Sequence, residues 1–359
     1  MLPSHPLLLP LFGSVASAAN LWASHYSGTI NYLTFNGNNL ALSSSSSTGN
    51  KLPSWLTYDN AGKGLYIADE NFIGNSGGTL TSFSIGNNGS LRSAGTAPTP
   101  QGLPLNGGQP MQTIKYTGKG PNTGRQEAAH PHHAFVDPTG DFIVVPDLGA
   151  DAIRIHKINH QTGALTDCAP GKPTPGTGPR HGVFWSPAGS SRVRRAEGTI
   201  LFIANELTNS VSSWAVTYAQ GGCMSLTLKQ TLTPYQGNTT AVSGTKVGEI
   251  RAKGNFLYNS NRNDKKFSGN DSITQYTISS TGTLTWTDIT SSYGTYPRTF
   301  DISKDGAFVA VGDQTTSNVA IVARDTTSGK LGKLVANLRI GAAGRPENED
   351  GLSAVVWEN

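Results

Sequence analysis

The 359-residue sequence is short of the features that build helical or highly charged proteins. Charged residues make up only 14% of the chain, and no stretch of a dozen residues repeats its apolar positions with a 3.6-residue period, so helix should be scarce. The apolar run near the N-terminus is too short for a membrane span and is interrupted by Pro10. The net charge is +4, with Lys and Arg scattered, so neither a membrane nor nucleic acid is an expected partner.

Glycine and proline, by contrast, are plentiful, at 43 and 20 residues. Serine, threonine and asparagine fill the gaps between short apolar runs. These residues supply the backbone angles that tight turns need. The composition therefore predicts an all-β protein made of many short strands.

A strand–turn–strand unit recurs along the chain at intervals of roughly 45–50 residues, the size of a β-propeller blade. The copies are Trp55–Glu70, His133–Leu148, His181–Glu206 with a Ser/Arg-rich insertion, Gly254–Arg262 and Arg298–Gln314. Each is followed by an alternating strand and a glycine turn, as in Ala152–Ile158. The pattern predicts a β-propeller.

The two ends complete one more blade. Asn20–His25 matches a second strand without its first, and Leu352–Trp357 matches a first strand without the rest. Their pairing would close the ring and remove two exposed sheet edges. We therefore expect a single propeller domain over residues 19–359, with six recognisable blades and no need to form oligomers.

One interval of the sequence does not match the blade repeat. Residues 91–129 are too many for a linker, yet they contain only one plausible strand, Met111–Tyr116. The interval is either a seventh blade reduced to a remnant or a long surface loop.

Several features predict secretion. Residues 1–18 combine an apolar core with a small-residue cleavage site at Ala16-Ser17-Ala18. The only cysteines, Cys168 and Cys223, would form one disulfide in an oxidising compartment. Three acceptor triplets for N-glycosylation begin at Asn88, Asn238 and Asn270.

Equivalent positions in different blades ring the same end of a propeller channel. When the blade repeats are aligned, His132 occupies the same position as Arg298. Arg180 and His181 come to that position as well if the alignment allows one bulged residue. The turn after the second strand supplies a second ring: His25, Glu70, Asp147, Glu206, Arg262 and Gln314. Such a cluster suits a carboxylate or phosphate ligand held by arginines, with His or Glu moving protons.

The sequence gives less support to a zinc site or a serine hydrolase. The His130-Pro-His-His133 spacing fits no standard zinc pattern, and no Gly-x-Ser-x-Gly elbow indicates a serine hydrolase. Asp69, Asp147, Asn205 and Asp313 recur once per blade and are expected to stabilise blades. His156 and His160 lie on or beside an outer strand and are expected at the surface.

Three segments carry a resemblance to a known family: His130–Gly140, Val144–Ile155 and Gly178–Phe184. They look like the seven-bladed lactonase propellers, which include bacterial 6-phosphogluconolactonase and the fungal 3-carboxy-cis,cis-muconate lactonizing enzyme. The resemblance spans most of the chain after residue 18. It implies a seven-bladed fold, of which this chain shows six blades.

The resemblance also implies site residues. The His, two Arg and Glu of the muconate enzyme correspond here to His132, Arg180, Glu206 and Arg262, with the arginines gripping a carboxylate and His132 or Glu206 as acid or base. The motif leaves open which of His130, His132 and His133 is the catalytic one. His130, His133, His181, Arg298, Glu70 and His25 are the expected substrate-binding residues.

The sequence leaves three functions open. The first is a secreted enzyme that opens or closes a carboxylate-bearing lactone or sugar, with no cofactor required. The second is a lyase that cleaves a rhamnosyl-glucuronate linkage, because secreted fungal propellers of similar appearance do so; that resemblance implies a calcium ion in the tunnel, with no ligands assigned. The third is a non-catalytic secreted glycoprotein, antigen or carbohydrate-binding propeller. An intracellular lactonase remains only if residues 1–18 are not a signal peptide.

Overall fold

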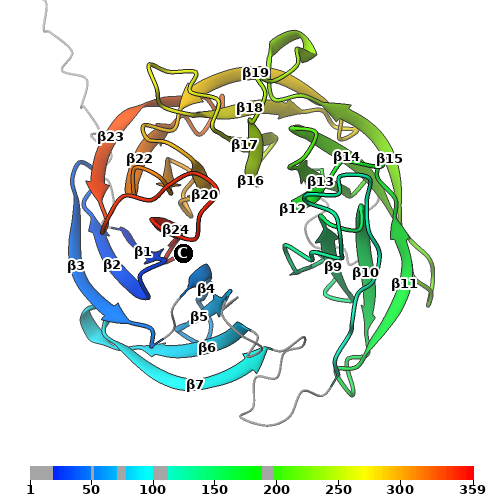
Figure 1. Ribbon diagram of the computed structural model, residues 1–359, viewed down its shortest axis with the longest axis horizontal. Coiled ribbons are helices and arrows are strands. Elements are labelled where there is room, and N and C mark those ends of the chain that lie inside the picture. The colour runs from blue at the N-terminus through cyan, green and yellow to red at the C-terminus, as the bar shows by residue number, and fades with distance from the viewer. Residues whose placement is uncertain (1–18, 50–51, 71–77, 100–111, 188–197) are drawn as a thin grey trace, which may run out of the picture.

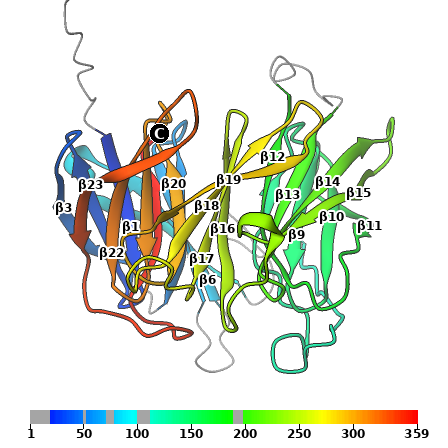
Figure 2. The same cartoon turned by 90° about the horizontal axis from the view of Figure 1, so that it is seen from above.

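The computed structural model describes residues 19–49, 52–70, 78–99, 112–187 and 198–359. They form six four-stranded antiparallel sheets arranged as blades around an axis (Figure 1), and Figure 2 shows the same ring from the side. The all-β class and the six blades are as the sequence predicts. The predicted signal peptide, residues 1–18, lies outside the described residues. None of the helical turns in the described ranges is long and apolar enough to cross a membrane.

The strands are named in chain order, with the innermost strand of each blade first. The first blade contains strands from both ends of the chain and comprises β24 (Leu352–Trp357), β1 (Ala19–His25), β2 (Thr29–Phe35) and β3 (Leu40–Ser47). The second comprises β4 (Pro53–Asp59), β5 (Gly64–Asp69), β6 (Gly78–Ile85) and β7 (Leu91–Thr99). The next two are β8 (Phe135–Val136), β9 (Phe142–Asp147), β10 (Ala152–Ile158) and β11 (Leu165–Gly171), then β12 (Pro179–Trp185), β13 (Ile200–Asn205), β14 (Ser210–Tyr218) and β15 (Met224–Leu232). The last two are β16 (Lys246–Lys253), β17 (Phe256–Arg262), β18 (Ser272–Ile278) and β19 (Leu284–Ser291), then β20 (Pro297–Ile302), β21 (Phe308–Asp313), β22 (Asn318–Arg324) and β23 (Leu331–Arg339). Two 3₁₀ turns, η1 (Asn87–Gly89) and η2 (Gln236–Asn238), lie between strands.

The ring closes through the two ends of the chain. Strand β24 is the innermost strand of the blade whose other three strands are β1, β2 and β3, and it pairs antiparallel with β1 from Leu21 opposite Trp357 to His25 opposite Leu352. Because the last strand is locked beside the first, the blade has partners on both sides of β1.

Five of the six junctions between neighbouring blades are filled by apolar side chains. Alternate residues of each strand point to opposite faces, so at each of these five junctions a row of side chains from one blade packs against a row from the next. Examples are Phe202 against Tyr276 and Phe300 against Tyr258. Among the described residues no such core joins β4–β7 to β8–β11.

A segment that we call the strap, residues 112–134, covers the face of blade β8–β11 that lacks a neighbouring core. The Tyr116 ring stacks on His156, with ring centres 5.7 Å apart, and lies under the Arg154 guanidinium at 4.4 Å. Gln126 is fully buried and donates to the carbonyl of Leu148 at 2.8 Å. The strap is thus a polar cover where a seventh blade would pack.

The structure corrects two expectations here. Residues 112–116 form no strand, because the side chain of Gln112, and not its backbone, pairs with Leu165, and Met111 lies outside the described residues; the strand of this interval is instead β7. His156 is not at the surface: it is 3% exposed, between Asp167 at 2.8 Å and the Tyr116 hydroxyl at 2.7 Å. His160 is exposed, as expected.

The predicted disulfide is present and joins Cys168, in β11, to Cys223, immediately before β15. It therefore ties blade β8–β11 to the blade on its packed side. Of the three glycosylation triplets, Asn88 and Asn238 lie exposed in the 3₁₀ turns and Asn270 is partly buried. Glycosylation itself stays a prediction.

An Asp or Asn residue ends the second strand of four blades (Asp69, Asp147, Asn205 and Asp313), and Asp147 and Asp69 hold turns, in line with the expected role. Asp147 is completely buried and accepts hydrogen bonds from the backbone N–H groups of His130 and Ala150. Asp69 accepts one from the backbone of Leu52. These bonds set the position of the loops that border the channel mouth.

Candidate active site

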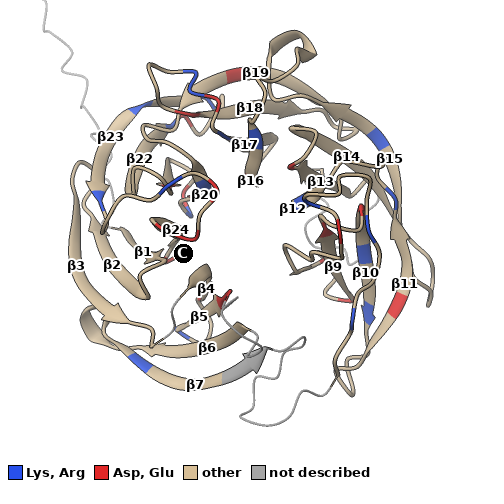
Figure 3. Ribbon diagram, viewed as in Figure 1, with Lys and Arg blue, Asp and Glu red and all other residues tan. Residues whose placement is uncertain are grey.

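A cavity of about 480 Å³ opens where the innermost strands and the turns after the second strands meet. The inner strands and their loops carry many of the charged residues (Figure 3). Seven of the ten predicted catalytic and binding residues line this cavity: His130, His132, Arg180, Glu206, Arg262, Arg298 and Glu70.

Strand register explains why the first-strand residues meet. Pairing with the second strands puts His132, Arg180 and Arg298 at one level of the channel. Trp55, His133, His181, Glu249 and Thr299 occupy the next level along the axis. The first level faces the cavity, and the second packs beneath it: the Trp55 ring lies 5.1 Å from that of His181 and 5.5 Å from that of His133.

Glu206, directly after β13, is the centre of the charged cluster. Its Oε2 atom lies 2.6 Å from Nη2 of Arg262 and 3.0 Å from Nε of Arg180, and its Oε1 atom lies 2.7 Å from Nη2 of Arg125. Burial alone would raise the pKa of this carboxyl, but the three guanidinium groups, led by Arg262, hold it well below its usual range. Glu206 is therefore ionised and is a poor proton donor at neutral pH.

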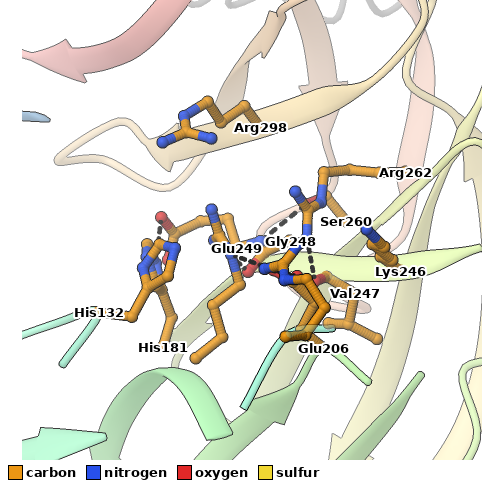
Figure 4. Close-up of polar contacts among 12 residues, drawn as sticks. His132, His181, Glu206, Lys246, Val247, Gly248, Glu249, Ser260, Arg262 and Arg298 are labelled. Carbon is orange, nitrogen blue, oxygen red and sulfur yellow. Dashed lines mark hydrogen bonds and ion pairs between the residues drawn. The ribbon is translucent and has the colours of Figure 1, made fainter. Parts of the chain in front are cut away.

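The two buried arginines are held by backbone as well as by Glu206. Arg180 donates to the carbonyl of Gly248 at 2.8 Å, and Arg262 donates to that of Val247 at 3.1 Å. Burial and then the neighbouring Arg262 lower the pKa of Arg180 to about 9, which leaves it charged at neutral pH. Figure 4 shows the side chains of Glu206 and Arg262 against strand β16.

Arg298 approaches the cavity from β20, apart from this cluster (Figure 4). Among the described residues its one ion pair is with Glu70, at 3.7 Å, and its guanidinium lies 5.5 Å from the Tyr26 ring centre. Burial raises the pKa of Tyr26 to about 12, so the phenol is neutral. Of the cavity cations, Arg298 is thus the one least committed to protein partners.

His132 lines the cavity as a neutral imidazole. Burial, and then the charge of Arg180, hold its pKa well below the usual range for histidine. Its Nδ1 atom lies 3.1 Å from Nε2 of His181. His130, at the rim, is instead paired with Glu127 at 2.8 Å and is 43% exposed, so His132 is the histidine of this motif that faces the arginines.

The structure does not bring His25, His133 and His181 into the cavity lining. His25 is 4% exposed and is bonded to Ser27 and to the carbonyl of Ala342, at the base of the loop before β24. His133 stacks between Phe135 and His181, at 4.6 and 4.8 Å. His25 is therefore held by its hydrogen bonds to that loop, whereas His133 and His181 belong to the level beneath the cavity.

The sequence analysis missed Arg125, Tyr296 and Glu347, which also line the cavity. Glu347 accepts hydrogen bonds from the Tyr296 hydroxyl and, at 2.7 Å, from Lys246, and lies 3.7 Å from Arg125. Arg125 belongs to the strap and Glu347 to the loop before β24, so neither belongs to the blade repeat and no register signal marks them. Glu249 was missed as well, although it occupies the His181 position of the next blade.

Among the described residues, no cluster of side-chain ligands marks a calcium site in the cavity. Within the described ranges no three His, Cys, Asp or Glu side chains group as metal ligands. Of the carboxylates that line the cavity, Glu206, Glu70 and Glu347 are paired with Arg or Lys, and Glu127 is paired with His130. No step of the chemistry below uses a metal.

Comparisons with known proteins agree with this architecture. The chain matches the family described as "Lactonase, 7-bladed beta-propeller" over residues 15–106 and 103–346. It is 31% identical over 316 residues to the "Probable 6-phosphogluconolactonase" of Arthroderma benhamiae, covering 79% of this chain and 76% of that one. It is 28% identical to the 6-phosphogluconolactonase of Formosa agariphila, over 84% of this chain and 75% of that one.

A solved structure, the periplasmic gluconolactonase PpgL of Pseudomonas aeruginosa, has the same fold. It superposes with a TM-score of 0.72 at 22% identity and covers 95% of this chain and 99% of that one. The chain therefore belongs to the seven-bladed β-propeller lactonase family, and its described residues form six of the blades.

Proposed function

We propose that this protein is a lactonase that hydrolyses a lactone bearing a carboxylate or another acidic group. The observation that carries the proposal is the meeting, in one cavity, of a neutral histidine with three arginines: His132 with Arg180, Arg262 and Arg298. Two of these arginines already neutralise Glu206. Arg298, with only a 3.7 Å ion pair, is the cation best able to accept a substrate anion.

The chemistry follows from these groups. A water molecule gives a proton to His132 as its oxygen bonds to the lactone carbonyl carbon. The charge that develops on the carbonyl oxygen is stabilised by the guanidinium groups. The ring C–O bond then breaks, the leaving alkoxide takes the proton back from His132, and the product is a hydroxy acid. Both carboxylate oxygens of Glu206 are paired with guanidinium groups, whereas Nε2 of His132 has no hydrogen-bond partner among the described residues, so His132 is favoured over Glu206 for both proton transfers.

The experiment is a pH-stat assay of acid release from purified protein. We would compare a carboxylate-bearing sugar lactone, 6-phosphogluconolactone and uncharged gluconolactone, the second because of the names of the relatives. We expect kcat/KM to be highest for an acidic lactone. Arg298→Gln should lower kcat/KM for the acidic lactones by about 100-fold and change it little for the uncharged one. His132→Gln should abolish turnover of all three.

Three outcomes would reject the proposal. Full activity of both variants would place the chemistry elsewhere. Inactivity of folded wild type on all three lactones, with ultraviolet absorbance rising on a glucuronate-terminated polysaccharide, would establish the lyase instead. Inactivity on every substrate would favour the non-catalytic glycoprotein.

We also propose that the protein is secreted, with residues 1–18 removed and the Asn88 and Asn238 turns glycosylated. The disulfide supports an oxidising compartment. N-terminal sequencing of the natural protein should begin at Ala19, and treatment with an N-glycosidase should lower its apparent mass. A sequence beginning at Met1 would overturn this proposal.

A further inference from the structure

Three side chains form a continuous hydrogen-bonded chain that runs from the buried Glu249 and His181 to His132, which is only partly buried and lines the cavity. Nδ1 of His132, in the strap, lies 3.1 Å from Nε2 of His181, in β12. Nδ1 of His181 lies 3.0 Å from Oε2 of Glu249, in β16. His181 and Glu249 are 2% and 0% exposed. Figure 4 shows His132, His181 and Glu249 beside Glu206 and Arg262.

The direction of every hydrogen bond in this chain is set at Glu249. Its Oε1 atom already accepts from the backbone N–H of Ile250 at 2.9 Å and from Nη1 of Arg251 at 2.7 Å. An ionised carboxylate only accepts, so Nδ1 of His181 must carry a proton and donate it to Oε2. A neutral imidazole has one donor and one acceptor, so Nε2 of His181 accepts from Nδ1–H of His132.

These hydrogen-bond directions fix which nitrogen of His132 is protonated in the cavity. With its proton on Nδ1, His132 keeps the lone pair of Nε2 free, and that atom has no hydrogen-bond partner among the described residues. His181 cannot easily turn to reverse the chain, because its ring is packed against both Trp55 and His133. Burial and nearby arginines also keep the pKa of His181 well below its usual range, in keeping with a neutral ring.

We propose that Glu249 is a positioning residue that, through His181, holds His132 in the tautomer whose Nε2 accepts the proton of the attacking water. The inference rests on the proposed function for the reaction that it serves, but the tautomer can be measured without any substrate. The same chain disperses positive charge toward Glu249 once His132 is protonated, as the carboxylate of a catalytic triad does.

The substitution Glu249→Gln tests the chain sharply. The two N–H donors at Oε1 require the amide oxygen there, so the amide NH₂ must face Nδ1 of His181. His181 would then carry its proton on Nε2, donate to Nδ1 of His132, and place the His132 proton on Nε2. We expect ¹⁵N NMR of the histidine rings to show protonated Nδ1 in the wild type and protonated Nε2 in the variant. We expect kcat to fall on the order of 1,000-fold, by analogy with the triad, while KM changes less than about threefold.

The matched control is Glu358→Gln. Glu358 accepts a hydrogen bond from the Tyr32 hydroxyl on β2, outside the cavity lining, so its loss should leave both the tautomer and kcat unchanged. A second variant, His181→Phe, keeps a ring against Trp55 and His133 but breaks the chain. It should lower kcat as Glu249→Gln does, and the double variant should lose no more than either alone.

The outcomes separate this inference from the proposed function. A wild-type His132 protonated on Nε2, or an unchanged tautomer or kcat in Glu249→Gln, would overturn the inference. Inactive wild type with the expected tautomer and its reversal in the variant would reject the lactonase proposal and uphold the positioning of His132. If Glu249→Gln does not fold, two other measurements test the inference. His132 should be protonated on Nδ1 in the wild type, and His181→Phe should remove that preference.

Discussion

The two faces of blade β8–β11 differ in composition, since one packs through apolar side chains and the other through polar ones. On one face Phe142 and Ile153 pack with Leu201 and Trp214 of the next blade, and the disulfide reinforces this junction. The other face meets the strap through polar contacts such as those of Tyr116. The strap also delivers Arg125, His130 and His132 to the cavity.

The difference shows that, in this blade, the residues that stabilise the fold lie on one face and the residues that line the cavity come from the segment on the other. Apolar burial contributes roughly 25 cal/mol per Å², whereas a polar contact replaces a contact with water and contributes much less. The packed face therefore holds the blade in the ring, and the strap face is free to carry charged groups. Each prediction below changes one face and leaves the other intact.

The largest effect is expected on the packed face. Trp214→Ala removes a side chain that is 2% exposed and should lower the free energy of unfolding by about 3–5 kcal/mol, measured by urea unfolding. The kcat of the remaining folded protein should not change, because Trp214 does not reach the cavity. A loss below about 1 kcal/mol would show that the apolar junction is not what holds the blade.

Removal of the disulfide should come next. The double substitution Cys168→Ser with Cys223→Ser should lower the free energy of unfolding by about 2–4 kcal/mol without altering kcat. The matched measurement is wild type unfolded with and without reductant, which should reproduce the same difference. Equal stability in all three samples would contradict the assigned role of the bridge.

The third prediction concerns pH and the strap. Burial lowers the pKa of His133 to about 4, whereas an unfolded histidine has its pKa near 6.5. The unfolded chain therefore binds this proton first, and stability is lost as the pH falls from about 6.5 toward 4. Between pH 7 and pH 5, His133 alone should account for a loss of about 2 kcal/mol.

The comparison variant is His133→Phe, which keeps a ring against Phe135 and His181 and cannot titrate. Asp264, whose pKa is raised by burial to about 6, gains stability over the same interval in both proteins and cancels in the difference. Parallel stability curves for wild type and variant would show that His133 is not held neutral.

The smallest effect on stability is expected for a charge of the strap. Arg125 is 41% exposed, so Arg125→Gln should cost less than about 1 kcal/mol in unfolding. Glu206 would keep Arg180 and Arg262, and kcat/KM should fall only severalfold in the pH-stat assay. A loss as large as that of Arg298→Gln would make Arg125 a direct substrate contact.

Much of the fold could be predicted because it repeats. Alternating apolar residues and polar, glycine-containing turns recur from blade to blade and indicate the same local structure each time. Alignment of those repeats placed His132 with Arg180 and Arg298. The prediction went wrong where the repeat stops. Residues 112–116 resemble a strand by composition, yet among the described residues they pair with no strand, and the side chain of Gln112 takes the place of backbone pairing at Leu165.

The sequence by itself determined the all-β class, the six blades, the cysteine pair and the set of inner-strand arginines, because these depend on periods and pairings that are local or repeated. Only the tertiary structure decided that Arg125 reaches Glu206, that His25 and His133 point away from the cavity, and that Glu249 ends a chain leading to His132. Those outcomes depend on which level of the channel each side chain enters and on where a segment outside the repeat comes to lie. Both are set by closure of the whole ring and not by any stretch of chain within it.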